Sequence, residues 1–144
     1  MPTAIDWDLE RFVAAQDPVY AQVCAELAAG RKRTHWMWFV FPQLKALGRS
    51  ATAQFFGLDG ADEATAYWQH PVLSERLRHC AELLRQLPGT DAHAIFGSPD
   101  TMKLRSCMTL FEIVAPDAPV FGDVLVRYFN GMRDDATVAL VSPA

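Results

Sequence analysis

Apolar residues recur every three or four positions along most of this chain, which is the spacing of one face of an α-helix. The longest such segment covers residues 71–87, and its apolar positions are Leu73, Leu77, Cys80, Ala81, Leu84 and Leu87. An earlier helix is predicted over residues 17–29, with Asp17 as its N-cap, Pro18 in its first turn and Gly30 as its stop. Both segments are predicted to bury one face.

Shorter helices are expected from the same signals. Each has a capping residue or an acidic first turn ahead of its apolar positions, and most have a glycine, asparagine or proline after them. Their predicted starts are Asp8, Ser50, Asp62, Ser98 with Pro99, Asp123 and Asp135. The Ser98 helix should run from about residue 100 to 114. A loop anchored by Ile95 and Phe96 is expected before it.

The run from Trp36 to Phe41 is apolar at every position, so periodicity does not assign it. Its composition resembles a buried strand, but the chain offers no second convincing strand to pair with it. Thr34 is a candidate N-cap, and the residue before Pro42 is disfavoured in a helix. We therefore expect a short, fully buried helix that ends before Pro42.

Together these elements predict a mostly α fold, a compact single domain (residues 1–144) of seven or eight short helices. A hydrophobic fraction of 51% and a charged fraction of 21% are typical of a soluble globular protein. The longest apolar run is too short to cross a bilayer and the first residues lack a signal-peptide pattern, so we expect a cytoplasmic protein with no membrane partner. Cys24, Cys80 and Cys107 are expected to be buried, reduced thiols.

One segment departs from the acidic character of the chain. The net charge is −4, yet residues 27–58 contain five basic residues and no acidic one. Three basic residues at 31–33 directly precede the aromatic run, and such side chains bind phosphate while Trp faces stack on planar rings. That combination suits a nucleotide. Two alternatives remain open: the basic residues compensate the dipole at the end of the preceding helix, or the aromatic side chains all belong to the core.

The predicted helix at 100–114 carries a second group of candidate residues: Asp100, Lys103, Arg105, Ser106, Thr109 and Glu112. Asp100 and Lys103 are one turn apart, so Lys103 pairs either with Asp100 or with a ligand phosphate. Polar groups among so many apolar neighbours need partners, which would be a ligand or the basic segment.

Other chemistries lack a motif. The four histidines have no metal-ligand spacing, so neither a metal nor a cofactor is expected. Overall acidity argues against general nucleic-acid binding. His35 lies where the charged turn meets the apolar run, and there it could act as an acid or base, hydrogen-bond a ligand, or be structural.

Long motifs give the chain a family resemblance. The stretches GRKRTHWMWFVFPQL, IFGSPDTMKLRSCMTLF and YFNGMRDDATVAL closely resemble the bacterial family called domain of unknown function 1810. Trp68 and Ser74 depart from the leucine and glycine usual there. The resemblance implies a mostly helical cytoplasmic protein and carries no established function.

A more distant likeness joins His35, Trp36, Gln43 and Lys45 to the NADAR superfamily, helical proteins associated with NAD and ADP-ribose. Some of them cleave N-glycosidic bonds of ADP-ribosylated bases. They rely on a glutamate beside the histidine, where this chain has Thr34. Asp100 or Glu112 would have to supply that carboxylate from another helix.

The leading hypothesis is a small anionic ligand of ADP-ribose or NAD type, with N-glycosidic hydrolysis as the candidate reaction. His35 with Asp100 or Glu112 would perform the chemistry. The candidate ligand-binding residues are Arg31, Lys32, Arg33, Trp36, Trp38, Gln43, Lys45, Lys103, Arg105, Ser106 and Thr109. The alternative is a non-catalytic protein-interaction module that uses the basic turn at residues 31–33.

Overall fold

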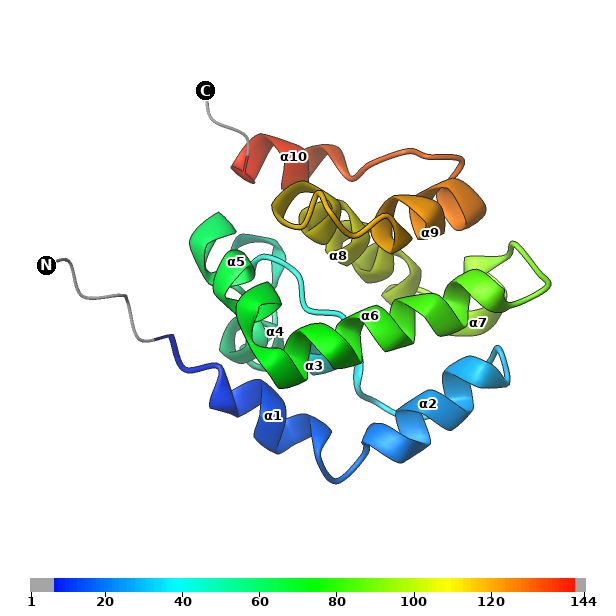
Figure 1. Ribbon diagram of the computed structural model, residues 1–144, viewed down its shortest axis with the longest axis horizontal. Coiled ribbons are helices and arrows are strands. Elements are labelled where there is room, and N and C mark those ends of the chain that lie inside the picture. Colours follow the sequence, from blue (N-terminus) through cyan, green and yellow to red (C-terminus); the bar gives the residue numbers. More distant parts are fainter. Residues whose placement is uncertain (1–6, 142–144) are drawn as a thin grey trace, which may run out of the picture.

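The computed structural model describes residues 7–141. Within that range the chain forms helices and no β-strand, which confirms the mostly α prediction (Figure 1). The elements are α1 (Glu10–Gln16), α2 (Tyr20–Ala28), α3 (Met37–Val40), η1 (Lys45–Leu47), α4 (Ala51–Phe56), α5 (Ala61–Gln69), α6 (Pro71–Gln86), α7 (Ala92–Phe96), α8 (Asp100–Val114), α9 (Val120–Phe129) and α10 (Asp135–Val141). The expected number of helices was therefore too low. None of the helices in this range is long and apolar enough to cross a membrane.

The long helices follow their predicted bounds closely. α6 begins at Pro71 and α8 spans residues 100–114, as their apolar patterns indicate. The predicted cap of α4 is also present, because Ser50 Oγ accepts a hydrogen bond from the Ala53 N–H at 3.0 Å. Gly30 follows the C-cap of α2, Ala29. Its φ of 73° is positive, a conformation that glycine adopts without strain. Asn130 closes α9 in the left-handed conformation.

The predicted N-caps of other helices were wrong. α1 begins one residue after Leu9, so Asp8 does not cap it, and α2 begins at Tyr20 because Asp17 instead ends α1. Ser98 does not cap α8, whose N-cap is Pro99. Cap signals describe only the local sequence, whereas short helices are stabilised mainly by tertiary packing, which those signals do not report.

The last two helices also begin differently from the prediction. α9 begins at Val120, three residues before the predicted start at Asp123. The cap of α10 is Asp134 instead of Asp135, because Asp134 Oδ2 accepts from the Thr137 N–H at 3.2 Å. In both cases the acidic residue chosen from the sequence lies inside the helix.

The predicted loop before α8 contains one further helix. α7 is a single turn of five residues, capped by Asp91, whose Oδ1 accepts from the Ala94 N–H at 3.2 Å. Ile95 and Phe96 are buried, so they do anchor this segment. A helix this short presents no repeating pattern, which is why periodicity does not detect it.

The aromatic run forms a helix, as predicted, but a shorter and less buried one. α3 is a single turn, and its N-cap is Trp36 instead of Thr34. Met37 and Val40 are buried, whereas Trp38 and Phe39 are only partly buried. The run therefore contributes both to the core and to the surface.

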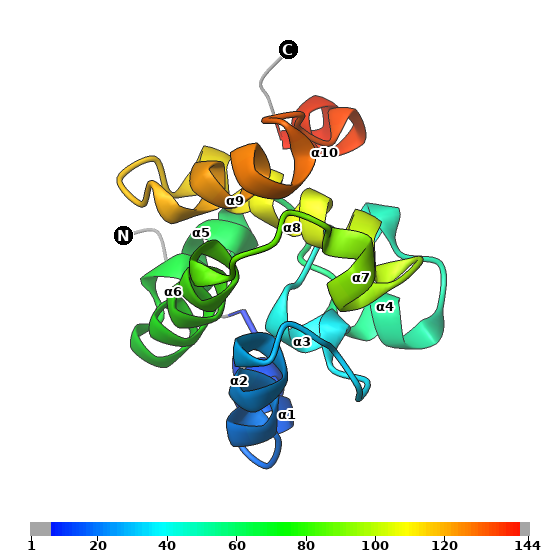
Figure 2. The same ribbon diagram turned by 90° about the vertical axis from the view of Figure 1, so that its right-hand side faces the viewer.

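The helices pack around one contiguous set of buried hydrophobic side chains. α8 lies at the centre and packs against α5, α7, α9 and α10. α6 crosses the middle of the molecule in Figure 1, with α1 and α2 along one side and α8 and α9 along the other. α3 packs against α1, and Figure 2 shows it close to the connection that leads from α2 into the aromatic run.

Two segments of backbone run side by side next to α4, where Leu44 and Leu58 form a parallel β-bridge. Lys45 N–H donates to Leu58 C=O at 2.7 Å, and Leu58 N–H donates to Gln43 C=O at 3.0 Å. At Gly57 an added Cβ would lie 2.4 Å from Lys45 Cα, which is shorter than real atoms tolerate. The close pairing of these two segments therefore requires a residue without a side chain at position 57.

Candidate functional site

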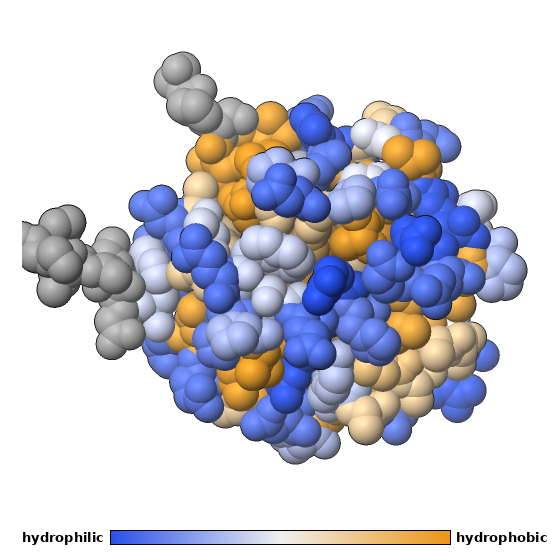
Figure 3. Space-filling view, in the orientation of Figure 1, coloured by the Kyte–Doolittle hydropathy of each residue, from blue (hydrophilic) through white to orange (hydrophobic). Residues whose placement is uncertain are grey.

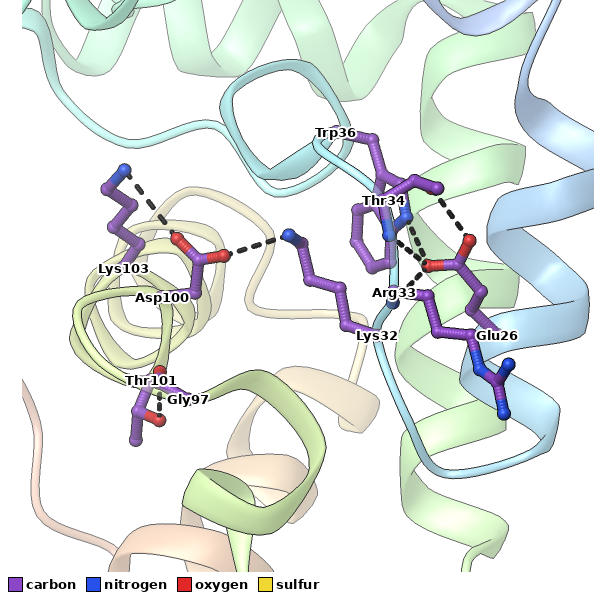
Figure 4. Close-up of polar contacts among 9 residues, drawn as sticks. All are labelled: Glu26, Lys32, Arg33, Thr34, Trp36, Gly97, Asp100, Thr101 and Lys103. Carbon is purple, nitrogen blue, oxygen red and sulfur yellow. Dashed lines mark hydrogen bonds and ion pairs between the residues drawn. The ribbon is translucent and has the colours of Figure 1, made fainter.

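The basic turn, residues 31–33, is held in place by a buried carboxylate. Glu26, in the last turn of α2, is only 3% exposed. Its Oε1 accepts from the N–H groups of Arg33 at 2.7 Å and Thr34 at 3.0 Å, and its Oε2 accepts from Thr34 Oγ1 at 2.7 Å (Figure 4). Trp36 Nε1 and Gln22 Nε2 donate to the same carboxylate at 2.9 and 3.0 Å. These five bonds fix the backbone of the turn.

The hydrogen bonds keep Glu26 ionised. Burial raises the pKa of this carboxyl, but the bonds from the Arg33 N–H, Thr34, Gln22 and Trp36 outweigh burial and lower the pKa to about 2. Glu26 was not among the candidate residues predicted from the sequence, in which it directly precedes the basic segment. One signal was available, because Glu26 directly precedes Leu27 of the apolar stripe, and a charge at the edge of a buried face needs partners.

The side chain of Lys32 extends from the basic turn to α8. Its N–H donates to Ile95 C=O at 2.8 Å, and its Nζ lies 3.0 Å from Asp100 Oδ2. Lys103 Nζ lies 3.6 Å from Asp100 Oδ1, so Lys103 pairs with Asp100, and Asp100 is shared by two lysines (Figure 4). The two ammonium groups also lie over indole rings, Lys32 over Trp36 and Lys103 over Trp38, each 5.2 Å from the ring centroid.

The other two basic side chains of the turn extend into solvent. Arg31 and Arg33 are exposed, as is the neighbouring His35. Together with Lys32, the two arginines line an open depression of about 460 Å³. The basic turn is therefore a fixed stretch of backbone that presents to solvent two guanidinium groups with no ion-pair partner among residues 7–141.

The two candidate stacking residues differ sharply in accessibility. Trp36 is 1% exposed and packs against Phe41 and Phe96, so its ring is core and offers no face to a ligand. Trp38 is partly buried and lines a crevice with Gln43, Lys103 and other residues. This crevice measures about 10 Å³, which is room for one water molecule.

The candidate catalytic carboxylates are not brought together. Asp100 and Glu112 lie at opposite ends of α8, twelve residues apart, which corresponds to roughly 18 Å along the helix axis. Glu112 Oε1 instead accepts from Arg133 Nε at 2.6 Å. His35, Asp100 and Glu112 therefore do not form a single group. Lys45 is exposed at the start of η1, where its backbone lies against Gly57.

The remaining polar residues of α8 have a structural partner, Asp134. Ser106 Oγ donates to Asp134 Oδ2 at 3.1 Å, Arg105 Nη2 lies 3.8 Å from Asp134 Oδ1, and Thr109 Oγ1 accepts from the Asp134 N–H at 2.9 Å. The partner expected for these buried groups was a ligand or the basic segment. They instead attach the segment before α10 to α8.

Neither a metal-binding cluster nor a disulfide occurs in the part of the chain that the structure describes. Residues 7–141 contain no group of three or more His, Cys, Asp or Glu side chains arranged to hold a metal ion. Cys80 and Cys107 are buried as expected, whereas Cys24 is only partly buried, and all three thiols are free.

The fold and the site define a small all-α protein whose basic turn is held in place by the buried Glu26. Its sequence and structure are similar to those of known proteins. The model of the family described as protein of unknown function (DUF1810) matches residues 6–141, and the chain belongs to that family. It is also similar to the crystal structure of the conserved hypothetical protein Rv1873 from Mycobacterium tuberculosis. The two are 49% identical, with a TM-score of 0.92 over 95% of this chain and 98% of that one. No curated protein matches the chain.

Proposed function

We propose that the basic turn binds the phosphate groups of a nucleotide-type ligand of the ADP-ribose or NAD class. The observation that supports this proposal is the set of five hydrogen bonds to Glu26, which we call the clamp. The clamp fixes the backbone of the turn while Arg31 and Arg33 stay exposed. A site whose backbone is already ordered loses little conformational entropy when it binds. Guanidinium groups are well suited to phosphate because their N–H donors match its oxygens in pairs.

Trp38 is the candidate for the ring of the ligand. Its indole is linked to the basic turn by a chain of contacts, through Lys103 over its ring and Asp100 to Lys32. The crevice beside it is too small for a base, so a base would stack on the part of the ring that faces solvent. Lys103 would then lie near both the ring and the phosphates.

The geometry supports binding more than hydrolysis. A general acid or a carboxylate that stabilises an oxocarbenium ion must lie at the reacting bond. Asp100 is engaged by two lysines, and Glu112 lies at the far end of α8 and pairs with Arg133. His35 remains exposed beside the turn, and hydrolysis would require it to act with a group supplied by the ligand or by water.

A second candidate function is recognition of an acidic protein segment. The depression at the basic turn is open and lined by Arg31, Lys32 and Arg33 alone, so it also fits a row of carboxylates. In this case Trp38 would play no part in binding.

Thermal unfolding with added ligand distinguishes the two candidates. If ADP-ribose at 1 mM binds with a Kd near 1 μM, the free energy of unfolding should rise by about 4 kcal/mol. The rise should disappear in the double variant R31A/R33A. It should persist in R49A/R78A, which removes the same charge from two exposed arginines outside the turn.

The panel should also contain AMP, pyrophosphate, inorganic phosphate and a peptide of alternating Asp and Glu. Binding of the acidic peptide alone, abolished by R31A/R33A, would favour the second candidate. If no member of the panel stabilises the wild-type protein, both candidates fail for these ligand classes.

A further inference from the structure

A hollow of about 450 Å³ lies between α6, the end of α5 and the connection from α8 to α9. One of its walls is formed by polar side chains of α6 and the other by residues 117–120, while Trp68 of α5 also lines it. The volume falls within the usual range of small-molecule sites. The function proposed above assigns no role to any of these residues.

We propose that this hollow binds a free α-amino acid with an apolar or aromatic side chain. The assignment rests on three groups that line the hollow together, the indole of Trp68, the guanidinium of Arg78 on one wall and the carboxylate of Asp117 on the other. An α-amino acid carries a carboxylate, an ammonium group and a side chain on a single carbon atom. It can therefore contact all three groups at once.

The wall formed by α6 supplies the positive charge. Ser74, Arg78 and Glu82 follow one another at intervals of four residues, so their side chains share one side of the helix. Arg78 is exposed and forms no ion pair within residues 7–141, because Glu82, one turn away, pairs with Arg85 at 2.8 Å. The guanidinium of Arg78 is thus available to bind both oxygens of a carboxylate, beside the hydroxyl of Ser74.

The opposite wall supplies the negative charge and apolar surface. Asp117 is exposed and has no ion-pair partner in the described part of the chain. Pro119 and Val120 line the hollow next to it. Because Arg78 and Asp117 do not pair with each other, both charges are available to a ligand that lies between them.

Trp68 provides a fixed aromatic surface. Its ring packs against two buried phenylalanine rings, with centroid distances of 5.2 Å to Phe121 and 6.4 Å to Phe111. Trp68 itself is only partly buried and lines the hollow, so part of its indole can contact a ligand. A ring already held by packing loses little conformational entropy on binding, and its flat face suits an apolar or aromatic side chain.

A larger groove on the α2 side of α6 fits this ligand less well. It measures about 830 Å³ and shares Arg78 with the hollow, but only α2 and α6 line it. Its aromatic ring is that of Tyr20, over which the Arg76 guanidinium already lies, 4.9 Å from the ring centroid. Figure 3 shows the side of the molecule that α6 crosses, where hydrophilic side chains surround small, separate hydrophobic patches. Such a surface suits a small ligand with charged and apolar parts.

Two-dimensional NMR of the isotope-labelled protein, titrated with L-phenylalanine, tests the proposal. A Kd of about 1 mM is expected, because the ligand has few atoms. The indole N–H signal of Trp68, identified by its loss in W68F, and the amide signals of Asp117 and Val120 should shift and reach saturation. The proposal is overturned if no signal shifts with saturation, or if the shifts are confined to the surroundings of Tyr20.

Three analogues test which parts of the ligand are recognised. N-acetyl-L-phenylalanine lacks the ammonium group, L-phenylalaninamide lacks the carboxylate, and glycine lacks the ring. Each should bind about tenfold more weakly than L-phenylalanine, because each loses one of the three contacts. If the amide binds as tightly as the free acid, the hollow accepts the N-terminus of a peptide, and the assignment to free amino acids is wrong.

Two substitutions assign the charges to the two walls. R78A should raise the Kd of L-phenylalanine about tenfold and leave the weaker binding of L-phenylalaninamide unchanged, whereas D117A should do the same for L-phenylalanine and spare N-acetyl-L-phenylalanine. R49A and D135A are the matched controls, because they remove the same charges from exposed residues outside the hollow. Arg78 and Asp117 are exposed, so the remaining signals should keep their wild-type positions. A wild-type Kd in both R78A and D117A would refute the site.

Discussion

At the scale of single residues, Glu26 governs the shape of the candidate site. Its carboxylate is charged, almost completely buried and surrounded by five donated hydrogen bonds. A buried charge is tolerated only when its hydrogen-bonding capacity is used in this way. The conformation of the basic turn therefore depends on one acidic residue that no ligand needs to touch.

Replacing Glu26 by Gln should destabilise the protein by about 3 kcal/mol at pH 7. The pKa of the carboxyl is about 2 in the folded protein against an ordinary 4.5, so the folded state binds fewer protons than the unfolded state between these values. This contribution to stability is complete above about pH 4.5 and is lost as the pH falls toward 2. Urea unfolding of the wild type and of E26Q should therefore differ at pH 7 and converge near pH 2.

The exposed Glu75 provides the control for this change. E75Q should unfold at nearly the wild-type urea concentration at both pH values, because Glu75 makes no ion pair or hydrogen bond among the described residues. An E26Q protein as stable as E75Q at pH 7 would show that the clamp does not contribute to stability.

The sequence predicted residue contacts well only where the partners are close along the chain. Ser50 caps the helix three residues before its partner, as predicted, and Asp100, three residues from Lys103, was one of the two partners left open for that lysine. The Lys32–Asp100 pair joins residues far apart in sequence, and no local pattern indicates it. The same limit explains why Trp36 was a candidate for ligand stacking although its indole N–H binds Glu26 in the core.

At the scale of helices, repetition of the apolar positions decides what can be predicted. α6 contains four turns of one amphipathic pattern and was predicted almost to the residue. α7, with a single turn, was read as a loop, and α9 begins three residues before Asp123, its predicted start. Short helices are stabilised mainly by tertiary packing, which local signals do not report.

The attachment of α10 to α8 should depend on Asp134. D134A removes the acceptor for Ser106 and for the first turn of α10, and leaves Arg105 without its carboxylate. We expect the free energy of unfolding to fall by about 2 kcal/mol. Urea unfolding gives the loss, and hydrogen exchange should accelerate most in α10.

D135A is the matched control, because Asp135 is an exposed acid of the first turn of the same helix. Its effect should stay within about 0.5 kcal/mol. An equal loss in both variants would mean that helix-terminal charge, instead of the contact with α8, is what Asp134 provides.

At the scale of the whole molecule, two helices far apart in the sequence position the basic turn. α2 contributes Glu26, which holds the backbone of the turn, and α8 contributes Asp100, which pairs with Lys32. The helices themselves surround one contiguous hydrophobic cluster that runs from α1 to α9. A single domain remains a prediction, and the cooperativity of unfolding tests it.

Two tryptophans test whether the chain unfolds as one unit. Trp36 packs against Phe41 and Phe96, whereas Trp68 packs against Phe111 and Phe121, in another part of the core. In W36F and W68F, the remaining fluorescence and the far-UV circular dichroism should report the same urea midpoint within each variant. Separate midpoints for the two signals would indicate two independently unfolding parts.

The close pairing of two backbone segments at Gly57 determines where this fold tolerates changes in chain length. The loop between α6 and α7 at residues 88–90 is exposed, and a side chain at Gly89 would meet no atom within 4 Å. Extra residues there cost only the entropy of a longer loop, about 0.6 kcal/mol for each doubling of its length. At position 57 the chain cannot gain even one carbon atom without separating two bonded segments. Insertions and deletions that leave the fold intact should therefore collect around residue 89 and spare residues 43–58.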